Sequence, residues 1–150
     1  STRIRQMLAA GEIGKAGELL GQPYFIYGTV CHGNQIAREK LDMPTANQLL
    51  PPGKLLPPFG VYASRVRTKY GDYHGVTNIG RKPTIPGENA AGAETHIFNF
   101  NSDLYGTELF VELHAFLRGE RKFSGLDALR EQMKADKEQC VQYFKTHGIQ

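Results

Sequence analysis

Residues 44–47 read Pro-Thr-Ala-Asn, and two of these four residues carry side-chain oxygens two positions apart. If the segment is extended, the side chains of Thr45 and Asn47 leave the same face of the strand, so that a hydroxyl and an amide oxygen converge. Neutral oxygens of this kind suit a hard cation such as Mg²⁺, which also takes water and phosphate oxygens as ligands. The alternative is that both residues cap a turn after Pro44, and these four residues alone favour that alternative.

Glu94 is the carboxylate whose position best suits a reaction. It follows a segment of small residues, 81–93, that predicts a long loop, and it begins a strand over 94–100. At the rim of a site, beside such a loop, a carboxylate can accept a proton from an attacking hydroxyl group. The alternative is a solvated glutamate at a strand end, which is the commoner position for a charged side chain. We expect the competing carboxylates Glu108 and Glu112 to be solvated.

Several familiar sites are absent from the sequence. Lys54 lacks the spacing of a Walker motif and has no Ser or Thr after it, and no GxGxxG follows a predicted strand. The five histidines lack HxxxH spacing, so we expect them to be solvated or hydrogen-bonded rather than metal ligands. Cys31 and Cys140 are far apart, which excludes a CxxC motif and indicates a reducing compartment.

The composition is that of one globular domain with many turns. Of 150 residues, 40% are hydrophobic, which is enough for a buried core, and the 17 glycines and 8 prolines favour a β-rich body. The net charge of +3 suits an anionic small ligand as well as nucleic acid, because the basic residues do not cluster. The sequence contains no run of 18 apolar residues and no signal peptide, so we expect a cytoplasmic protein without a membrane partner.

Strands must position the candidate residues, because the hydrophobic pattern has a period of two from Pro23 onward. The Gly71-Asp72 pair predicts a hairpin turn. Six short strands separated by turn signals predict an all-β fold, a closed or nearly closed antiparallel barrel of Greek-key type. We expect the strands over residues 24–31, 47–50, 61–70, 73–80, 94–100 and 108–118.

Short helices are expected before the barrel, in residues 1–22. Gly11 ends the first helix and Gly21 the second. This piece is too small for a core of its own, so it packs on the main domain or is left over from a preceding one. The residues expected to be buried are Ile4, Met7 and Leu8 in the first helix and Ala16, Leu19 and Leu20 in the second.

A long helix is expected after the barrel, covering one side of it. Ser124 is placed to cap this helix, Asp127 occupies the capping-box position, and Phe123 can act as a hydrophobic staple. An apolar stripe with helical spacing predicts the buried face. Its members are Leu126, Leu129, Met133, Cys140, Val141 and Phe144.

Six stretches in order, with natural spacing, carry a resemblance to a known family. They read PTAN, FGVYASRV, GVTNIGRKPT, ETHIFNF, DLYGTEL and FLRGERKFSGLDALREQM. Over about residues 23–145 they closely resemble the riboflavin kinase module at the C-terminal end of bacterial bifunctional riboflavin kinase/FAD synthetases. Residues 1–22 look like the tail of the adenylyltransferase module that precedes it. We therefore expect a helical tail or linker over 1–22 and a kinase domain over 23–150.

The resemblance implies a six-stranded antiparallel barrel with a long C-terminal helix and an ATP-dependent activity, phosphorylation of the riboflavin 5′-hydroxyl to give FMN. It implies that Thr45 and Asn47 hold Mg²⁺ with the ATP phosphates, and that Glu94 is the base for the ribityl hydroxyl. The implied partners are riboflavin, FMN, ATP and ADP, with an adenylyltransferase module in the parent chain. No nucleic-acid partner is implied.

The resemblance also implies further binding residues on both sides of the reaction. Asn78 and Gly80 would bind ATP at the start of a second flap. Arg118 and Phe123 would border the flavin ring, whose flat apolar face suits the edge of the C-terminal helix.

The segment 33–43 would cover the nucleotide phosphates, with Gly33 and Arg38 closest to them. Here the chain departs from the family pattern, because Ala37 and Asp42 stand where glycines are expected. Each lost glycine limits how closely the backbone approaches phosphate, and Asp42 adds a negative charge near an anionic ligand.

Two other functions remain open from the sequence. The altered segment 33–43 raises the possibility of a flavin-binding barrel that no longer phosphorylates. A nucleic-acid-binding barrel is the third hypothesis, because small basic β-barrels often bind single strands. No RNA-binding motif in the sequence favours it.

Overall fold

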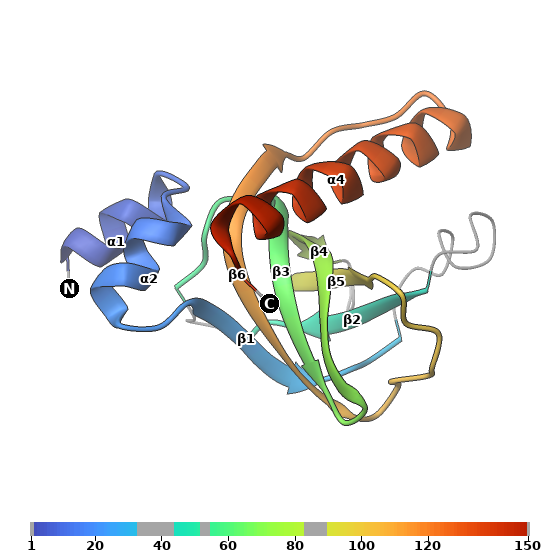
Figure 1. Ribbon diagram of the computed structural model, residues 1–150, viewed down its shortest axis with the longest axis horizontal. Coiled ribbons are helices and arrows are strands. Elements are labelled where there is room, and N and C mark those ends of the chain that lie inside the picture. The colour runs from blue at the N-terminus through green and yellow to red at the C-terminus, as the bar shows by residue number, and fades with distance from the viewer. Residues whose placement is uncertain (1, 33–43, 52–54, 83–89, 150) are drawn as a thin grey trace.

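The computed structural model describes residues 2–32, 44–51, 55–82 and 90–149 (Figure 1). Its described part contains two short N-terminal helices, a curved antiparallel sheet and one long C-terminal helix that lies across the sheet. This confirms the predicted fold class. The helices are α1 (Thr2–Ala9), α2 (Ile13–Leu20) and α4 (Leu126–His147), and the strands are β1 (Tyr24–Thr29), β2 (Thr45–Leu49), β3 (Gly60–Thr68), β4 (Gly71–Lys82), β5 (Ala90–Ile97) and β6 (Glu108–Gly119).

The sheet has the order β1-β6-β3-β4-β5-β2, and every neighbouring pair is antiparallel. Its two edges are tied together next to the predicted metal motif. The backbone N–H of Cys31 donates to the carbonyl of Asn47 at 2.7 Å, and the buried amide of Gln48 donates to the carbonyls of Gly28 and Leu109 at 3.1 and 2.9 Å. These bonds curl the sheet into a nearly closed barrel and fix β2 against β1 and β6.

The hairpin turn between β3 and β4 lies two residues earlier than predicted. Lys69 and Tyr70 form the turn, and Gly71 already pairs with Thr68. The reason is the Thr68 hydroxyl, which accepts from the Tyr70 N–H and donates to the Gly71 carbonyl, both at 2.9 Å. A threonine that bonds the backbone in this way stabilises a turn, so the chain reverses before the expected Gly71-Asp72 pair.

The predicted loop 81–93 was too long. β4 continues to Lys82 and β5 begins at Ala90, where the small residues of β5 pair with β4 on one side and with β2 on the other. Residues with small side chains can form a central strand but give no alternating hydrophobic pattern. The sequence pattern therefore could not reveal this part of β5. As a consequence, Glu94 lies inside β5 and does not begin it.

Two apolar cores lie on opposite faces of the sheet. The inner core fills the barrel and includes Leu8, Ile13 and Ala16 from the N-terminal helices, so these helices pack on the main domain. The outer core lies between the sheet and α4. Its buried members are Val61, Ala63, Val76, Phe98, Cys140 and Phe144.

The helices differ from prediction in which residues they bury. In α2, Ile13 and Ala16 face the barrel, whereas Leu19 and Leu20 are 48% and 45% exposed. In α4, Leu126 and Val141 are exposed. The helix follows Gly125 and has no side-chain cap, so Ser124 is not the N-cap. The backbone at Gly125 is fully extended, which carries the chain into the helix without the predicted capping box.

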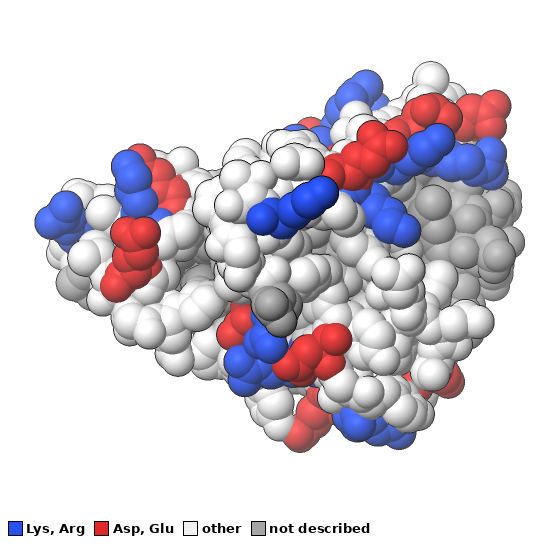
Figure 2. Space-filling model, viewed as in Figure 1, with Lys and Arg blue, Asp and Glu red and all other residues white. Residues whose placement is uncertain are grey.

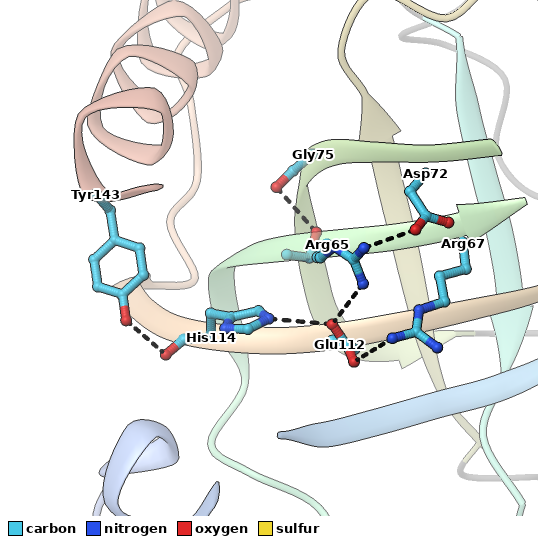
Figure 3. Close-up of polar contacts among 8 residues, drawn as sticks. Arg65, Arg67, Asp72, Gly75, Glu112, His114 and Tyr143 are labelled. Atoms are coloured by element: carbon cyan, nitrogen blue, oxygen red, sulfur yellow. Dashed lines mark hydrogen bonds and ion pairs between the residues drawn. The ribbon is translucent and has the colours of Figure 1, made fainter. Parts of the chain in front are cut away.

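Glu112 was expected to be solvated but is only 8% exposed. Figure 3 shows its carboxylate on β6, facing Arg65 and Arg67 of β3 and the ring of His114. The three closest nitrogens lie at 3.6, 3.5 and 3.4 Å, and Arg65 is also paired with Asp72 at 2.7 Å. The long side chains of β3 cover the outer face of β6, which strand alternation alone could not show. We call Glu112, Arg65, Arg67 and His114 the Glu112 cluster.

Candidate active site

The strand register places four of the predicted site residues in one row across the sheet. Asn47 is opposite Glu94, Glu94 is opposite Asn78, Asn78 is opposite Val61, and Val61 is opposite Arg118. Directly opposed residues in antiparallel strands extend their side chains from the same face. Residues far apart in the sequence therefore meet on the face of the sheet that α4 covers.

A first cavity of about 320 Å³ opens at one end of this row. Its walls are residues 30–32 just after β1, the start of β2 and the connection between β5 and β6, and they include Asn47 and Cys31. The rings of His32 and Tyr105, both at its edge, are stacked with centroids 3.8 Å apart. A stacked aromatic pair beside short polar side chains suits a ligand with a flat base and polar groups.

A second cavity of about 490 Å³ lies between the row and α4. Its wall combines carboxylate, imidazole and guanidinium groups from the sheet with apolar side chains from the helix. Such a mixture suits a flat, largely apolar ligand with a few polar groups. The lining includes Asn78, Glu94, His96, Arg118, Phe123, Leu129 and Met133.

Thr45 lines both cavities, so it marks the place where they meet. Asn47 faces the first cavity, and its cross-strand partner Glu94 faces the second. A group held in one cavity could thus be passed to a group held in the other across the distance of one strand pair. This is the arrangement that a transfer reaction between two bound ligands needs.

Asn47 has an unusual environment for a buried polar side chain. It is 7% exposed, and its Oδ1 atom has no hydrogen-bond partner among the described residues. A buried acceptor without a partner costs about 1–3 kcal/mol, so such an atom is available to a water, an ion or a ligand that reaches it. Together with the Thr45 hydroxyl on the same face of β2, this oxygen fits Mg²⁺ that takes its other ligands from phosphate and water.

The described residues contain no group of three or more His, Cys, Asp and Glu side chains placed to hold a metal ion. As far as the described residues go, a metal site at Thr45 and Asn47 would take its further ligands from the substrate and from water. Mg²⁺ commonly binds in this way, through few protein groups and the phosphates of a substrate.

Arg118 is held in the wall of the second cavity by a carboxylate that the sequence did not reveal. Its Nε and Nη2 atoms donate to the two oxygens of Asp136 at 2.9 and 2.8 Å. Its guanidinium carbon lies 5.8 Å from the centroid of the Phe123 ring, and that of Arg121 lies 5.2 Å from it. The two residues predicted to border a flavin thus contact each other.

His96 is a further residue of the second cavity. It lies two positions after Glu94 on the same face of β5, opposite Thr45. Burial and, secondarily, the charge of Lys137 lower the pKa of His96, so the ring is neutral at pH 7. Its spacing from Glu94 was the one sequence signal that could have identified it.

The remaining predicted residues are placed as follows. Asn78 lies in β4 and lines the second cavity, although ATP was its expected ligand. Gly80 also lies in β4, where a Cβ atom would collide with the Glu120 carboxylate, so a larger residue there would require the Glu120 side chain to move. Gly33 and Arg38, with the rest of segment 33–43, lie outside the described residues.

A family model described as riboflavin kinase matches residues 20–144. The chain belongs to the riboflavin kinase family. A bifunctional riboflavin kinase/FMN adenylyltransferase of Bacillus subtilis is 40% identical to it, over 96% of this chain and 46% of that protein. One of Pseudomonas fluorescens is 41% identical, over 91% and 43%. The chain therefore spans about half the length of the curated relatives it matches.

Solved structures agree with this fold. Riboflavin kinase from Trypanosoma brucei superposes with a TM-score of 0.58, covering 83% of this chain and 81% of that one, and at 21% identity this likeness shows the fold alone. A structure described as a macrolide-efflux protein of Streptococcus pneumoniae superposes with a TM-score of 0.82 at 37% identity, over 92% of this chain and 45% of that one. Among the described residues, no helix is long and apolar enough to cross a membrane.

Proposed function

We propose that this chain transfers the terminal phosphoryl group of ATP to the 5′-hydroxyl of riboflavin, giving FMN and ADP. The observation that carries the proposal is that two cavities meet at Thr45, with Asn47 in one and Glu94 in the other. Family membership supplies the reaction class, and the two cavities supply a place for each substrate.

The first cavity suits the nucleotide. Thr45 and Asn47 would hold Mg²⁺ there, and the ion, when bound, neutralises charge on the phosphates during transfer. The His32–Tyr105 stack at the edge of the same cavity offers a flat aromatic surface for the base. This chain's contribution is to hold the nucleotide so that its last phosphate reaches the boundary at Thr45.

The second cavity suits riboflavin. Leu129 and Met133 of α4 offer an apolar wall for the ring, and Arg118 and Phe123 close its edge. Glu94, on the same wall, would accept the proton of the ribityl hydroxyl as that oxygen attacks the phosphoryl group. The neutral His96 beside it adds no positive charge that would compete for the carboxylate.

We also propose the wider setting of the chain. Residues 1–22 would connect to an adenylyltransferase module, as the curated relatives are bifunctional, and residues 23–150 would form the kinase domain. Because Leu8 and Ile13 are buried in the barrel core, the connecting helices would also stabilise the kinase. A cytoplasmic location is proposed from Cys31 and Cys140, which are both free.

Neither rival function is favoured by a specific observation. Thr45, Asn47 and Glu94 are all present at the meeting point of the cavities, which a module that only binds flavin would not need. On the face shown in Figure 2, Lys and Arg side chains are interspersed with Asp and Glu, along α4 in particular. A nucleic-acid-binding surface would instead gather basic residues into a patch.

The test is to incubate the chain with riboflavin, ATP and Mg²⁺ and to separate FMN from riboflavin by chromatography. We expect FMN that depends on both ATP and Mg²⁺. Quenching of riboflavin fluorescence without FMN formation would instead support the flavin-binding module. No quenching and no FMN would reject both.

A further inference from the structure

Asp136 is the most deeply buried carboxylate of α4, at 3% exposure. The helix is otherwise rich in exposed charges, and helical periodicity did not place this residue on its buried stripe. Taking a carboxylate out of water costs several kcal/mol unless close partners compensate it. A buried charge at this place therefore requires an explanation.

The compensation comes from both sides of the second cavity. The carboxylate accepts two bonds from Arg118 in a bidentate arrangement, at 2.9 and 2.8 Å. The amide of Gln132, one turn earlier on α4, donates to its Oδ1 at 2.9 Å. Bidentate Arg–carboxylate pairs fix the plane of the guanidinium as well as its position.

Arg118 is therefore oriented from α4, although it stands on β6. Its Nη1 atom also donates to the Gly119 carbonyl at 3.1 Å, so three of the five guanidinium N–H groups are engaged. The other two have no partner among the described residues, and the guanidinium lies near the Phe123 ring in the cavity wall. They remain for acceptor atoms of a ligand.

We propose that Asp136 is a positioning residue that sets the affinity of the second cavity for riboflavin by orienting Arg118. The inference rests on the proposed function, because it assigns riboflavin to that cavity. Asp136 does not act on ATP, whose cavity lies on the other side of the Thr45 boundary. Its substitution should change the two substrate constants by different amounts.

The experiment compares Asp136→Asn, Arg118→Gln and the double variant with the unmodified chain. KM is measured for riboflavin and for ATP, and riboflavin binding is measured separately by fluorescence quenching, without ATP. We expect each single variant to weaken riboflavin binding and raise its KM about tenfold or more, as expected for a lost charged hydrogen bond. KM for ATP should stay within about twofold. The double variant should be no weaker than Arg118→Gln alone.

Asp127→Asn is the matched control on the same helix. Asp127 is 99% exposed and pairs with Arg130 at 3.3 Å, so its loss should change neither constant. A second variant keeps the test valid if Asp136→Asn unfolds. Arg118→Met combined with Asp136→Leu replaces the buried pair by apolar groups, which is commonly tolerated. We expect it to fold and to bind riboflavin as weakly as Arg118→Gln.

Three results would overturn the inference: unchanged riboflavin affinity in a folded Asp136→Asn variant, equal increases in both KM values, or additive losses in the double variant. If Asp136→Asn unfolds, normal riboflavin affinity in the apolar double variant would overturn it. Failure of the proposed function is distinct. In that case the unmodified chain itself would bind no riboflavin or form no FMN.

Discussion

The two cavities on either side of Thr45 differ in whether their buried polar side chains have hydrogen-bond partners. In the first, the buried Oδ1 atom of Asn47 has no hydrogen-bond partner among the described residues. In the second, the buried carboxylate of Asp136 is fully paired, with Arg118 and Gln132 as donors. The first cavity thus has an acceptor, Asn47 Oδ1, that is unpaired within the described part of the chain and that a ligand can reach. In the second cavity the position of Arg118 is already fixed by Asp136.

This difference fits two ligands of different chemistry. A nucleotide brings many charged oxygens and a metal ion, so the cavity proposed for it could leave coordination incomplete until both are bound. Riboflavin is uncharged and has a flat ring system, so the cavity proposed for it would have to provide shape and oriented donors from the start. Substitutions on each side of Thr45 test this contrast, and the largest effect is expected at Glu94.

Replacing Glu94 by Gln should give the largest effect. The amide keeps the size of the side chain but cannot accept the hydroxyl proton, so turnover should fall by about 10²–10⁴. Riboflavin binding should stay within about threefold, as followed by fluorescence quenching. Glu131→Gln, an exposed change on α4, serves as control. FMN production at the normal rate by the Glu94 variant would show that this carboxylate is not the base.

Asn47→Ala and Asn78→Ala form a matched pair, because the two asparagines are both opposite Glu94 in the row but line different cavities. For Asn47→Ala we expect kcat/KM for MgATP to fall by about 10², because a positioned metal is worth several kcal/mol in such reactions. Riboflavin affinity should be preserved.

Asn78→Ala should show the reverse pattern. Its KM for riboflavin should be higher than that of the unmodified chain, and its KM for ATP should stay within about twofold. Initial rates are measured while one substrate is varied and the other is saturating, and the two resulting KM values show which substrate each variant affects. If Asn78→Ala instead raised the ATP KM, the sequence-based assignment of Asn78 to ATP would be correct, and its place in the second cavity would not reflect its role.

Glu112→Gln should destabilise the fold without affecting either cavity. The Glu112 cluster buries one carboxylate among two guanidinium groups and an imidazole (Figure 3), so neutralising it removes the carboxylate partner of Arg67 and leaves Arg65 with Asp72. We expect a loss of about 2–3 kcal/mol in the free energy of unfolding, measured with urea. Both KM values should be unchanged. A shift in KM with normal stability would mean that this cluster is linked to the site.

The smallest effect should come from pH. Burial lowers the pKa of His114, opposed by Glu112 and assisted by Arg65 and His74, and burial also lowers the pKa of His96. Because the unfolded chain protonates first, stability should decrease as the pH falls through about 6.5, and should keep decreasing until the folded histidines are charged. His114→Gln should make the decrease between pH 7 and 5 less steep. An equally steep decrease in that variant would assign the effect to other groups.

The sequence predicted the six strands and the long helix, because alternation and helical spacing are local features. It did not predict that Glu94 lies inside a strand, since Ala91 to Ala93 carry no alternating signal. Nor did it predict Asp136, whose burial depends on Arg118 of another element. Pairings between residues far apart in the sequence have no local pattern, and in this chain one of them positions the Arg118 guanidinium in the wall of the second cavity.

The most direct measurement asks whether the two cavities are filled at the same time. Riboflavin would be titrated into the chain by fluorescence quenching, with and without a saturating non-hydrolysable ATP analogue and Mg²⁺. Two cavities that meet at Thr45 without overlapping predict that riboflavin still binds, with one equivalent per chain, when the analogue is present. Displacement of riboflavin by the analogue would contradict the assignment of the two substrates to separate cavities.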